Sequence, residues 1–309
     1  MRNAFYGLAL VAIAGLLGGC LVTVPAPRAD EGTAPVDYRA VQALSIEVFN
    51  PGEAAIFAVS SVLVMGRDEA LLIDAQFSSR QASQLIERVR ASGRRLTTIY
   101  ISHGDPDYYF GLETLHAAFP EARIVATPQT VAHINATWRD KLKVWGPELA
   151  GGAPKSIIIP EPLAGDTLML EGQALNIIGL DGPAPERTAV WIPSLETIAG
   201  GIPVTAGEHV WMADTQSAES HARWLNLLEQ IRQLQPTRII PGHFSGAMPN
   251  GQQALTFTRD YIRAFDEETT RTANAAELIA AMKKRYPGLP GESGLELSAK
   301  VAKGEMQWP

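Results

Sequence analysis

The sequence predicts an α/β fold in which strands and helices alternate along the chain. Two observations predict it. From residue 38 onward, short apolar runs bounded by turn residues alternate with amphipathic stretches, and the same succession of element types occurs again in the second half. The chain has 309 residues, of which 46% are hydrophobic and 19% charged, so it can bury one large core or two smaller ones.

The first half begins with two expected strands, residues 56–65 and 70–74, which are joined by the turn Gly66-Arg67-Asp68. An amphipathic helix is expected over residues 78–92, because its apolar side chains recur on one face. The next expected elements are a strand at 96–102, a helix at 111–119, a strand at 123–126 and a helix from 128 to about 142.

The second half repeats this pattern with shorter strands. Four strands are expected, at 168–170, 174–180, 188–192 and 197–199, followed by a helix at 218–234 and a strand at 238–240. Two further helices, at 252–265 and 275–285, precede a tail that contains proline and glycine.

The first twenty residues have the pattern of a secretion signal. Arg2 precedes an apolar run, residues 4–17, that is short for a membrane span and leads to Gly18-Gly19-Cys20. Leu-Gly-Gly-Cys resembles the bacterial lipobox, whose cysteine is lipidated, and Cys20 is the only cysteine of the chain. We expect a lipoprotein signal peptide at 1–20, with an ordinary signal peptide and an incidental cysteine as the alternative.

The residues after Cys20 predict where the protein resides. Residues 21–36 are rich in proline and alanine and are expected to form a tether. Leu21 and Val22 lack the aspartate that, by the same resemblance, retains lipoproteins at the inner membrane. We therefore expect an outer-membrane lipoprotein that faces the periplasm. The net charge of -7 argues against nucleic acid or an anionic membrane surface as the main partner.

One stretch concentrates side chains that bind metals. His103, Asp105 and Asp107 directly follow the expected strand at 96–102. Side chains at i and i+2 of an extended segment point the same way, so these three can converge on one point. A cluster of histidine and carboxylates at a strand end is a candidate metal site.

This stretch resembles the His-x-His-x-Asp-His signature of the metallo-β-lactamase superfamily, with Asp105 and Tyr108 in place of two histidines. Residues 61–64 and 70–75 resemble the opening hairpin of that family, and 239–243 resembles the turn that delivers its last histidine, His243. The resemblance implies a four-layer αββα sandwich, formed here by a domain at 37–309 with a C-terminal helical extension.

The family's two-metal site is only partly present. The loop at 179–188, which should supply a third histidine, contains none, and Gly201 stands where a bridging aspartate is expected. Asp181 is the expected substitute in that loop, with Glu186 as an alternative. The resemblance therefore implies one divalent metal, zinc or, because carboxylates favour harder ions, Mn or Fe, or else no metal. Its expected ligands are His103, Asp105, Asp107, Asp181 and His243.

Some of these residues also have structural interpretations. His103 could be a core or turn histidine, and Asp105 could form an Asx-turn ahead of Pro106. Further along, His209 and Asp214 are expected to line the pocket or to supply missing ligands. The alternatives are a structural histidine and the beginning of a helix.

Tyr108 is expected in the wall of the pocket. A neutral phenol, with a pKa near 10, is a poor metal ligand unless a metal helps to deprotonate it.

The resemblance, together with a ligand set that suffices for hydrolysis, implies a metal-dependent hydrolase that acts on an ester, lactone or amide-type bond of a small molecule. A metal with an open position lowers the pKa of its bound water, and Asp107 is the expected catalytic residue that orients or deprotonates this water. β-Lactam hydrolysis is supported by superfamily analogy alone. The alternatives are a non-catalytic binding or accessory lipoprotein that retains the fold after losing the dinuclear site, and a redox enzyme of the same fold.

Overall fold

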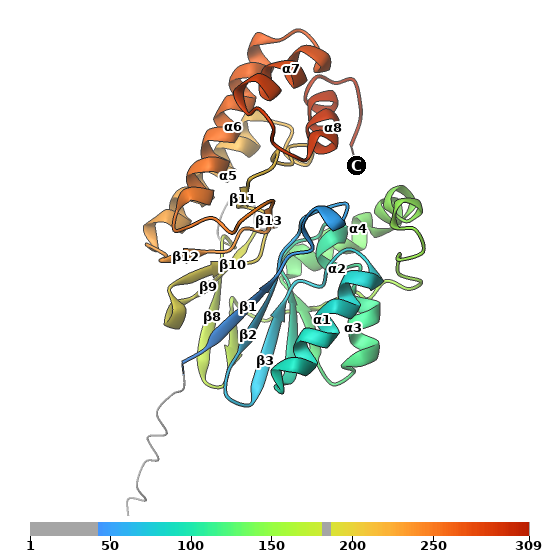
Figure 1. Ribbon diagram of the computed structural model, residues 1–309, viewed down its shortest axis with the longest axis vertical. Coiled ribbons are helices and arrows are strands. Elements are labelled where there is room, and N and C mark those ends of the chain that lie inside the picture. The colour runs from blue at the N-terminus through green and yellow to red at the C-terminus, as the bar shows by residue number, and fades with distance from the viewer. Residues whose placement is uncertain (1–42, 181–186, 309) are drawn as a thin grey trace, which may run out of the picture. The chain divides into compact units, whose positions relative to one another are not determined.

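The computed structural model describes residues 43–180 and 187–308, and Figure 1 shows how their elements are arranged. The expected lipidation site Cys20, the expected tether and the expected ligand Asp181 lie outside the described residues. The alternative ligand Glu186 lies outside them as well.

The first sheet has six strands in the order β1-β2-β3-β4-β5-β6. The first three strands pair antiparallel, and β3 to β6 pair parallel. The carboxyl ends of β3 and β4 therefore meet at one edge, where Asp74 and His103 follow them. The strands are β1 (Ser45–Phe49), β2 (Ser61–Met65), β3 (Glu69–Ile73), β4 (Arg95–Ile101), β5 (Arg123–Ala126) and β6 (Glu161–Pro162).

The second sheet has five strands in the order β12-β10-β9-β8-β7. A separate parallel pair, β11 with β13, sets Thr205 opposite His243. The strands of the sheet are β7 (Thr167–Leu170), β8 (Gln173–Ile178), β9 (Ala189–Ile192), β10 (Thr197–Ala199) and β12 (Arg238–Ile239), and the separate pair is β11 (Thr205–Ala206) and β13 (His243–Phe244).

The sheets face each other across a buried core, and helices cover their outer faces (Figure 1). Leu71 and Tyr100 of the first sheet share this core with Val190 of the second. The helices α1 (Ser79–Ser92) and α3 (Leu112–Ala118) pack on the outer side of the first sheet, and α5 (Ala218–Gln233) and α6 (Gln253–Arg271) share a core with the second. The predicted four-layer αββα sandwich is confirmed.

The sequence dictates helix α1 locally. The hydroxyl of Ser78 accepts a hydrogen bond from the backbone N–H of Gln81, 3.4 Å away, and so caps the first turn. Gly93 ends the helix in the left-handed conformation, with φ 67°. The expected helix at 78–92 and the observed one thus differ by the capping residue alone.

The expected strand at 56–65 is half as long in the structure, because strand β2 begins at Ser61. The preceding residues form a loop that contains a 3-10 turn, η1 (Gly52–Ala54). Asn50 holds this loop, since its side-chain amide donates hydrogen bonds to the carbonyls of Ala58 and Phe244, 2.8 and 3.0 Å away. Its apolar side chains are therefore available to line a cavity.

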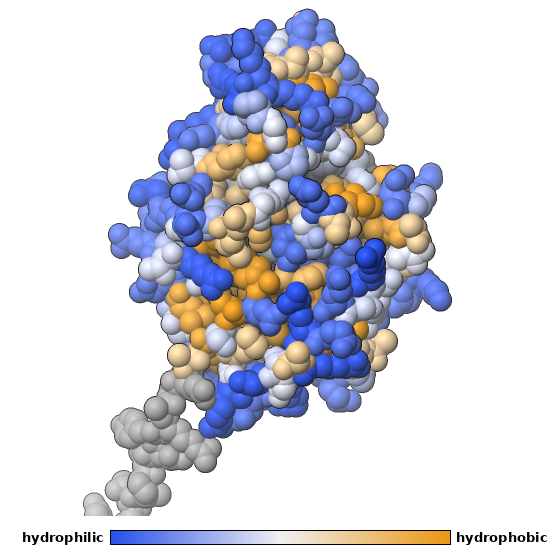
Figure 2. All heavy atoms as spheres, viewed as in Figure 1, coloured by the Kyte–Doolittle hydropathy of each residue, from blue (hydrophilic) through white to orange (hydrophobic). Residues whose placement is uncertain are grey.

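The C-terminal part of the chain is more helical than expected. After α7 (Ala275–Arg285), which was predicted with the same bounds, the tail contains a further helix, α8 (Glu292–Ala302). The proline and glycine of the tail conceal this helix in the sequence. Across the described residues, no helix combines the length and apolar character that crossing a membrane requires. Figure 2 shows that the visible surface over these helices is largely hydrophilic.

Candidate active site

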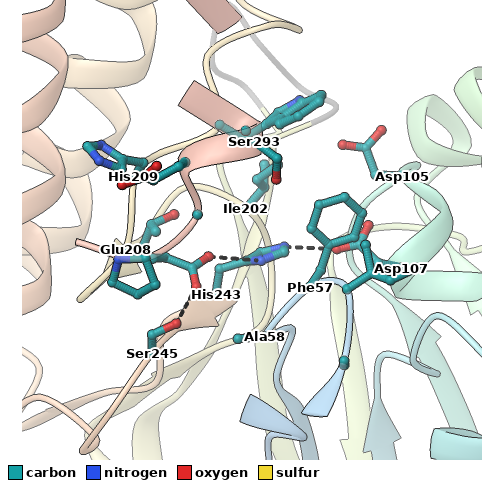
Figure 3. Close-up of a pocket in the computed structure, with 18 of the residues that line it drawn as sticks. Phe57, Ala58, Asp105, Asp107, Ile202, Glu208, His209, His243, Ser245 and Ser293 are labelled. Atoms are coloured by element: carbon teal, nitrogen blue, oxygen red, sulfur yellow. Dashed lines mark hydrogen bonds and ion pairs between the residues drawn. The ribbon is translucent and has the colours of Figure 1, made fainter. Parts of the chain in front are cut away.

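A cavity of about 260 Å³ lies at the edge of the fold where β4, β11 and β13 bring the predicted residues together (Figure 3). Asp105 and Asp107, which follow β4, form part of its lining together with His243 of β13. The loop at 52–58, helix α4 (Pro128–Trp145) and the segment at 290–294 complete the wall. The site is thus assembled from both halves of the chain.

A buried hydrogen-bonded link fixes the backbone beneath the site. The carboxylate of Asp74 accepts hydrogen bonds from the backbone N–H and the hydroxyl of Ser102, at 2.8 and 2.6 Å. The same hydroxyl accepts a hydrogen bond from the backbone N–H of Gly201, at 2.7 Å. Burial raises the pKa of Asp74 to about 7, although the bonds from Ser102 oppose this rise. The link ties the ends of β3, β4 and β10 and so sets the position of His103.

The first cluster of functional side chains contains His103, Asp105 and Lys141. His103 Nε2 lies 3.2 Å from one carboxylate oxygen of Asp105, and the Lys141 ammonium forms an ion pair with the other. Lys141, only 3% exposed, also lies 3.4 Å from Nε2 of His133. Burial alone would raise the pKa of Asp105, but the neighbouring Lys141 ammonium and His103 hold it well below its usual value.

Asp214 completes this group, which we call the His103 cluster (His103, Asp105, Asp214 and Lys141). The two carboxylate oxygens of Asp214 accept hydrogen bonds from the indoles of Trp211 and Trp308, both at 2.7 Å. Burial and the neighbouring Asp105 carboxylate raise the pKa of Asp214 to about 6. One ligand atom from each of His103, Asp105 and Asp214 lies within 4.8 Å of the others.

A second group, the His243 cluster, consists of His243, Asp107 and Glu208. His243 Nε2 lies 2.9 Å from Asp107 and Nδ1 lies 3.5 Å from Glu208, as the dashed lines in Figure 3 show. The hydroxyl of Ser245 donates a hydrogen bond to Glu208, at 2.6 Å. Burial lowers the pKa of His243, but hydrogen bonds to the two carboxylates outweigh this and raise it to about 10. Both ring nitrogens are therefore engaged as donors.

The predicted pocket residues lie in different environments. Tyr108 is fully buried between two histidines, with ring centroids 5.3 Å from His103 and 5.7 Å from His243, and is absent from the cavity lining. Its hydroxyl has no hydrogen-bond partner among the described residues. His209 lines the cavity, but its Nδ1 lies 2.8 Å from the hydroxyl of Tyr261.

Two residues of the site, Lys141 and Glu208, were not predicted from the sequence. Lys141 lies in α4 on the face that carries Ile134, Trp138 and Trp145, all of which pack in the core around the first sheet. A lysine at helical spacing from three apolar residues was the available signal. Glu208 stands beside the predicted His209, and nothing in the sequence distinguishes which of the two faces the histidine of β13.

The His103 cluster fits one divalent ion. An imidazole and two carboxylates are suitable ligands for zinc, manganese or iron, and three protein ligands leave a position open. Asp105 and Asp214 bring two carboxylates together in a buried place, which a divalent cation would stabilise. Lys141 supplies a single positive charge there.

The second metal position of a two-metal site does not fit. Gly201 stands in the left-handed region, with φ 79°, and a Cβ at this position would lie 1.9 Å from the carbonyl oxygen of Thr188. An aspartate therefore has no room there. His243 is the other expected ligand, and both of its ring nitrogens are engaged by carboxylates.

Comparisons with known proteins agree with this fold. The profile of the metallo-beta-lactamase superfamily matches residues 55–243. A metallo-beta-lactamase family protein from Thermus thermophilus is similar in structure, with a TM-score of 0.60 and 16% identity over 84% of this chain and 93% of that one. Two further similar structures, each with a TM-score of 0.51 and 16% identity, are a metallo-beta-lactamase from Pontibacter korlensis, over 72% of this chain and 95% of that one, and FIM-1 from Pseudomonas aeruginosa in its mono-zinc form, over 71% and 90%. No curated protein matches the chain.

Proposed function

This chain belongs to the metallo-beta-lactamase superfamily, and from that premise we propose that it is a hydrolase that uses one divalent metal ion. The observation that carries the proposal is the His103 cluster, in which an imidazole and two carboxylates offer ligand atoms within 4.8 Å of one another. Asp105 of this cluster also lines the cavity, so a bound ion would lie beside the space that a substrate occupies.

His103, Asp105 and Asp214 would hold the ion, and the ion would polarise the bond to be cleaved and acidify the attacking water. Asp107 lines the same cavity and would accept the proton of that water. His243 lies 2.9 Å from Asp107 and orients its carboxylate, while Glu208 fixes the imidazole from the other side at 3.5 Å. The protein thus keeps its proton acceptor separate from its metal ligands.

We propose an ester, lactone or amide-type bond of a small molecule as the substrate. The cavity of about 260 Å³ is slightly smaller than the usual range for small-molecule sites, about 300 to 1,000 Å³, which favours a small substrate. The relatives from Pontibacter korlensis and Pseudomonas aeruginosa are metallo-beta-lactamases, and FIM-1 has been obtained in a mono-zinc form. That form supports the idea that this fold accepts a single metal.

Metal analysis tests this proposal. Protein purified without chelator and then incubated with zinc, manganese or iron should retain one ion per chain, measured by mass spectrometry. His103→Ala should lose it, whereas His116→Ala, on the exposed side of α3, should not. A chelator should abolish hydrolysis of chromogenic esters or lactones by the wild type. Substoichiometric metal under every loading condition would contradict the proposal.

A metal-free binding protein is the second candidate, and Lys141 favours it. Its buried ammonium already neutralises Asp105 in the place where a metal would be held. If this lysine substitutes permanently for the metal, the protein should bind ligands in the cavity without cleaving them. Unchanged ligand binding in the presence and absence of chelator, with no turnover, would favour this candidate.

We also propose that the protein is a lipoprotein anchored through Cys20 at the periplasmic side of the outer membrane. The lipobox-like Leu17-Gly18-Gly19-Cys20 and the absence of aspartate after the cysteine support this proposal. Labelling of cells with a fatty acid should mark the wild type but not Cys20→Ala. Recovery of the unlabelled protein in the soluble fraction in both cases would contradict it.

A further inference from the structure

We propose that the cavity selects an organic cation, a quaternary ammonium or protonated amine group carried on an apolar body. This cavity is the proposed active site, and the inference names the class of substrate that would bind there. Its relevance to catalysis rests on the proposed function. The binding itself can be tested without turnover. Two independent features of the wall, its aromatic ring and its charge balance, carry the inference.

The first feature is a closed ring of four aromatic side chains that line the cavity: Phe57, Trp145, Trp211 and Trp308. Ring centroids are 5.1 Å apart for Phe57 and Trp145, and 6.4 Å apart for Trp145 and Trp308. They are 5.2 Å apart for Trp308 and Trp211, and 6.4 Å apart for Trp211 and Phe57. Each ring thus contacts two others, although they come from four distant places in the sequence.

These aromatic side chains are held in place by other contacts. Trp211 and Trp308 both donate indole hydrogen bonds to the carboxylate of Asp214, at 2.7 Å. Phe57 also packs on Phe77, at 5.4 Å between ring centroids. A preformed group of aromatic rings attracts cations through the negative faces of the rings, and quaternary ammonium groups are bound in this way.

The second feature is the excess of negative charge in the lining. Five carboxylates contribute to it, whereas Lys141 and His243 are the cationic members among the described residues. Lys141 is paired with Asp105, and His243 lies between two carboxylates. The lining carboxylates are those of Glu53, Asp105, Asp107, Glu208 and Glu292.

An anionic ligand would therefore meet no unpaired cation in the described part of the wall. Both the carboxylates and the aromatic rings attract an organic cation. The apolar body of such a ligand would also displace water from the aromatic rings. A divalent metal in the His103 cluster would reduce the negative charge but leave the aromatic ring unchanged.

Binding of matched probes to the full chain tests the inference. Choline and 3,3-dimethylbutan-1-ol have the same shape and differ in charge, and trimethylacetate is an anion of similar bulk. Tryptophan fluorescence should report binding, because Trp145, Trp211 and Trp308 line the cavity. In chelator-treated protein, we expect choline to bind at least about tenfold more tightly than the neutral alcohol, and trimethylacetate more weakly than both.

Two pairs of variants locate the binding. Trp145→Leu should weaken choline binding about tenfold, whereas Trp138→Leu, on the same helix but outside the lining, should leave it unchanged. Glu53→Gln changes an exposed residue at the cavity and should weaken binding about threefold, while Glu121→Gln, exposed elsewhere, should not. The second pair remains informative if Trp145→Leu fails to fold.

Each outcome separates this inference from the proposed function. In chelator-treated protein, equal affinity for choline and its neutral isostere, or tighter binding of the anion, overturns the inference even if the metal-loaded protein hydrolyses esters. Choline selectivity in a protein that holds no metal and cleaves nothing supports the inference and overturns the proposed function. Calorimetry on metal-loaded and on chelator-treated protein measures the affinity for choline with and without the metal.

Discussion

The His103 cluster and the His243 cluster lie at the same edge of the fold, and each places an imidazole beside two carboxylates. In the His243 cluster both carboxylates pair with one imidazolium, so both ring nitrogens are engaged and neither is open to a metal. In the His103 cluster the negative charge of Asp214 remains close to that of Asp105, and the pKa of Asp214 is raised to about 6. The difference indicates which of two similar groups can accept a metal.

In the family's two-metal site the ligands are shared between two metals, whereas here they form two separate clusters. Both nitrogens of His243 face carboxylates, so this histidine has no nitrogen left for one of the two metals of the family's site. The remaining cluster keeps enough donors for the other. Four changes to the molecule would break or sharpen this contrast.

The largest effect is expected from an attempt to restore the missing bridging ligand. Gly201→Asp should destabilise the protein by about 4 kcal/mol or more and should not add a second metal, because its Cβ would lie 1.9 Å from the Thr188 carbonyl oxygen. Gly151→Asp is the matched control, since this glycine has a similar φ of 84° and open space around it. If chemical denaturation shows that Gly201→Asp and Gly151→Asp lower the free energy of unfolding equally, the backbone conformation alone is responsible for the loss of stability.

Breaking the His243 cluster should have the next largest effect. Asp107→Asn leaves a buried imidazolium with one carboxylate fewer and should lower the free energy of unfolding by about 3 to 5 kcal/mol. Asp140→Asn removes an exposed carboxylate and should change stability by less than about 0.5 kcal/mol. Urea denaturation of both variants measures this, and a small loss for Asp107→Asn would mean that the ion pair is dispensable.

The pH dependence of stability should show the same cluster. The pKa of His243 rises from 6.5 to about 10 on folding, so the folded protein binds a proton that the unfolded chain releases between these values. The free energy of unfolding should therefore fall by about 2 to 4 kcal/mol as the pH rises through this range. Denaturation at several pH values, with chelator present, measures the slope.

The variant His243→Gln separates the loss of stability caused by His243 from the loss caused by Asp74. Asp74, whose pKa rises from 3.8 to about 7, should cause a loss of stability over that lower range. His243→Gln should flatten the upper range and leave the lower one. An unchanged slope above about pH 7 in this variant would contradict the assignment.

The smallest expected effect concerns the His103 cluster. Lys141→Met removes the ammonium that competes for Asp105 and should increase zinc affinity about tenfold, measured by calorimetry. Lys143→Met, exposed on the same helix, is the control. Unchanged or weaker zinc binding would mean that Lys141 orients Asp105 for the metal rather than competing with it.

The sequence predicted the sandwich well because its strands and helices have strong local signals. The bounds of β5 and α7 were predicted to the residue, and α1 to its capping serine. The helix α8 was missed because residues 287–291, which contain two prolines and two glycines, conceal its beginning. Strand β2 was predicted too long, because the apolar side chain of Phe57 belongs to the cavity rather than to a sheet.

The candidate site was less predictable, because its pairings depend on how distant segments meet. His103 and Asp105 were expected to share a point with Asp107, yet the chain begins helix α2 (Pro106–Tyr109) at Pro106, and Asp107 turns toward His243 instead. Extended geometry does not continue through a helix. Contacts such as that of Lys141 with Asp105, 36 residues away, have no local signature.

The link between Asp74, Ser102 and Gly201 has a consequence for hydrogen exchange. The amide of Gly201 belongs to a turn after β10, where exchange with solvent is ordinarily fast. Here it donates to the buried Ser102 hydroxyl, whose own proton is held by Asp74. Deuterium should therefore reach this amide as slowly as it reaches the central strands, and one serine side chain would determine how often the edges of the two sheets separate.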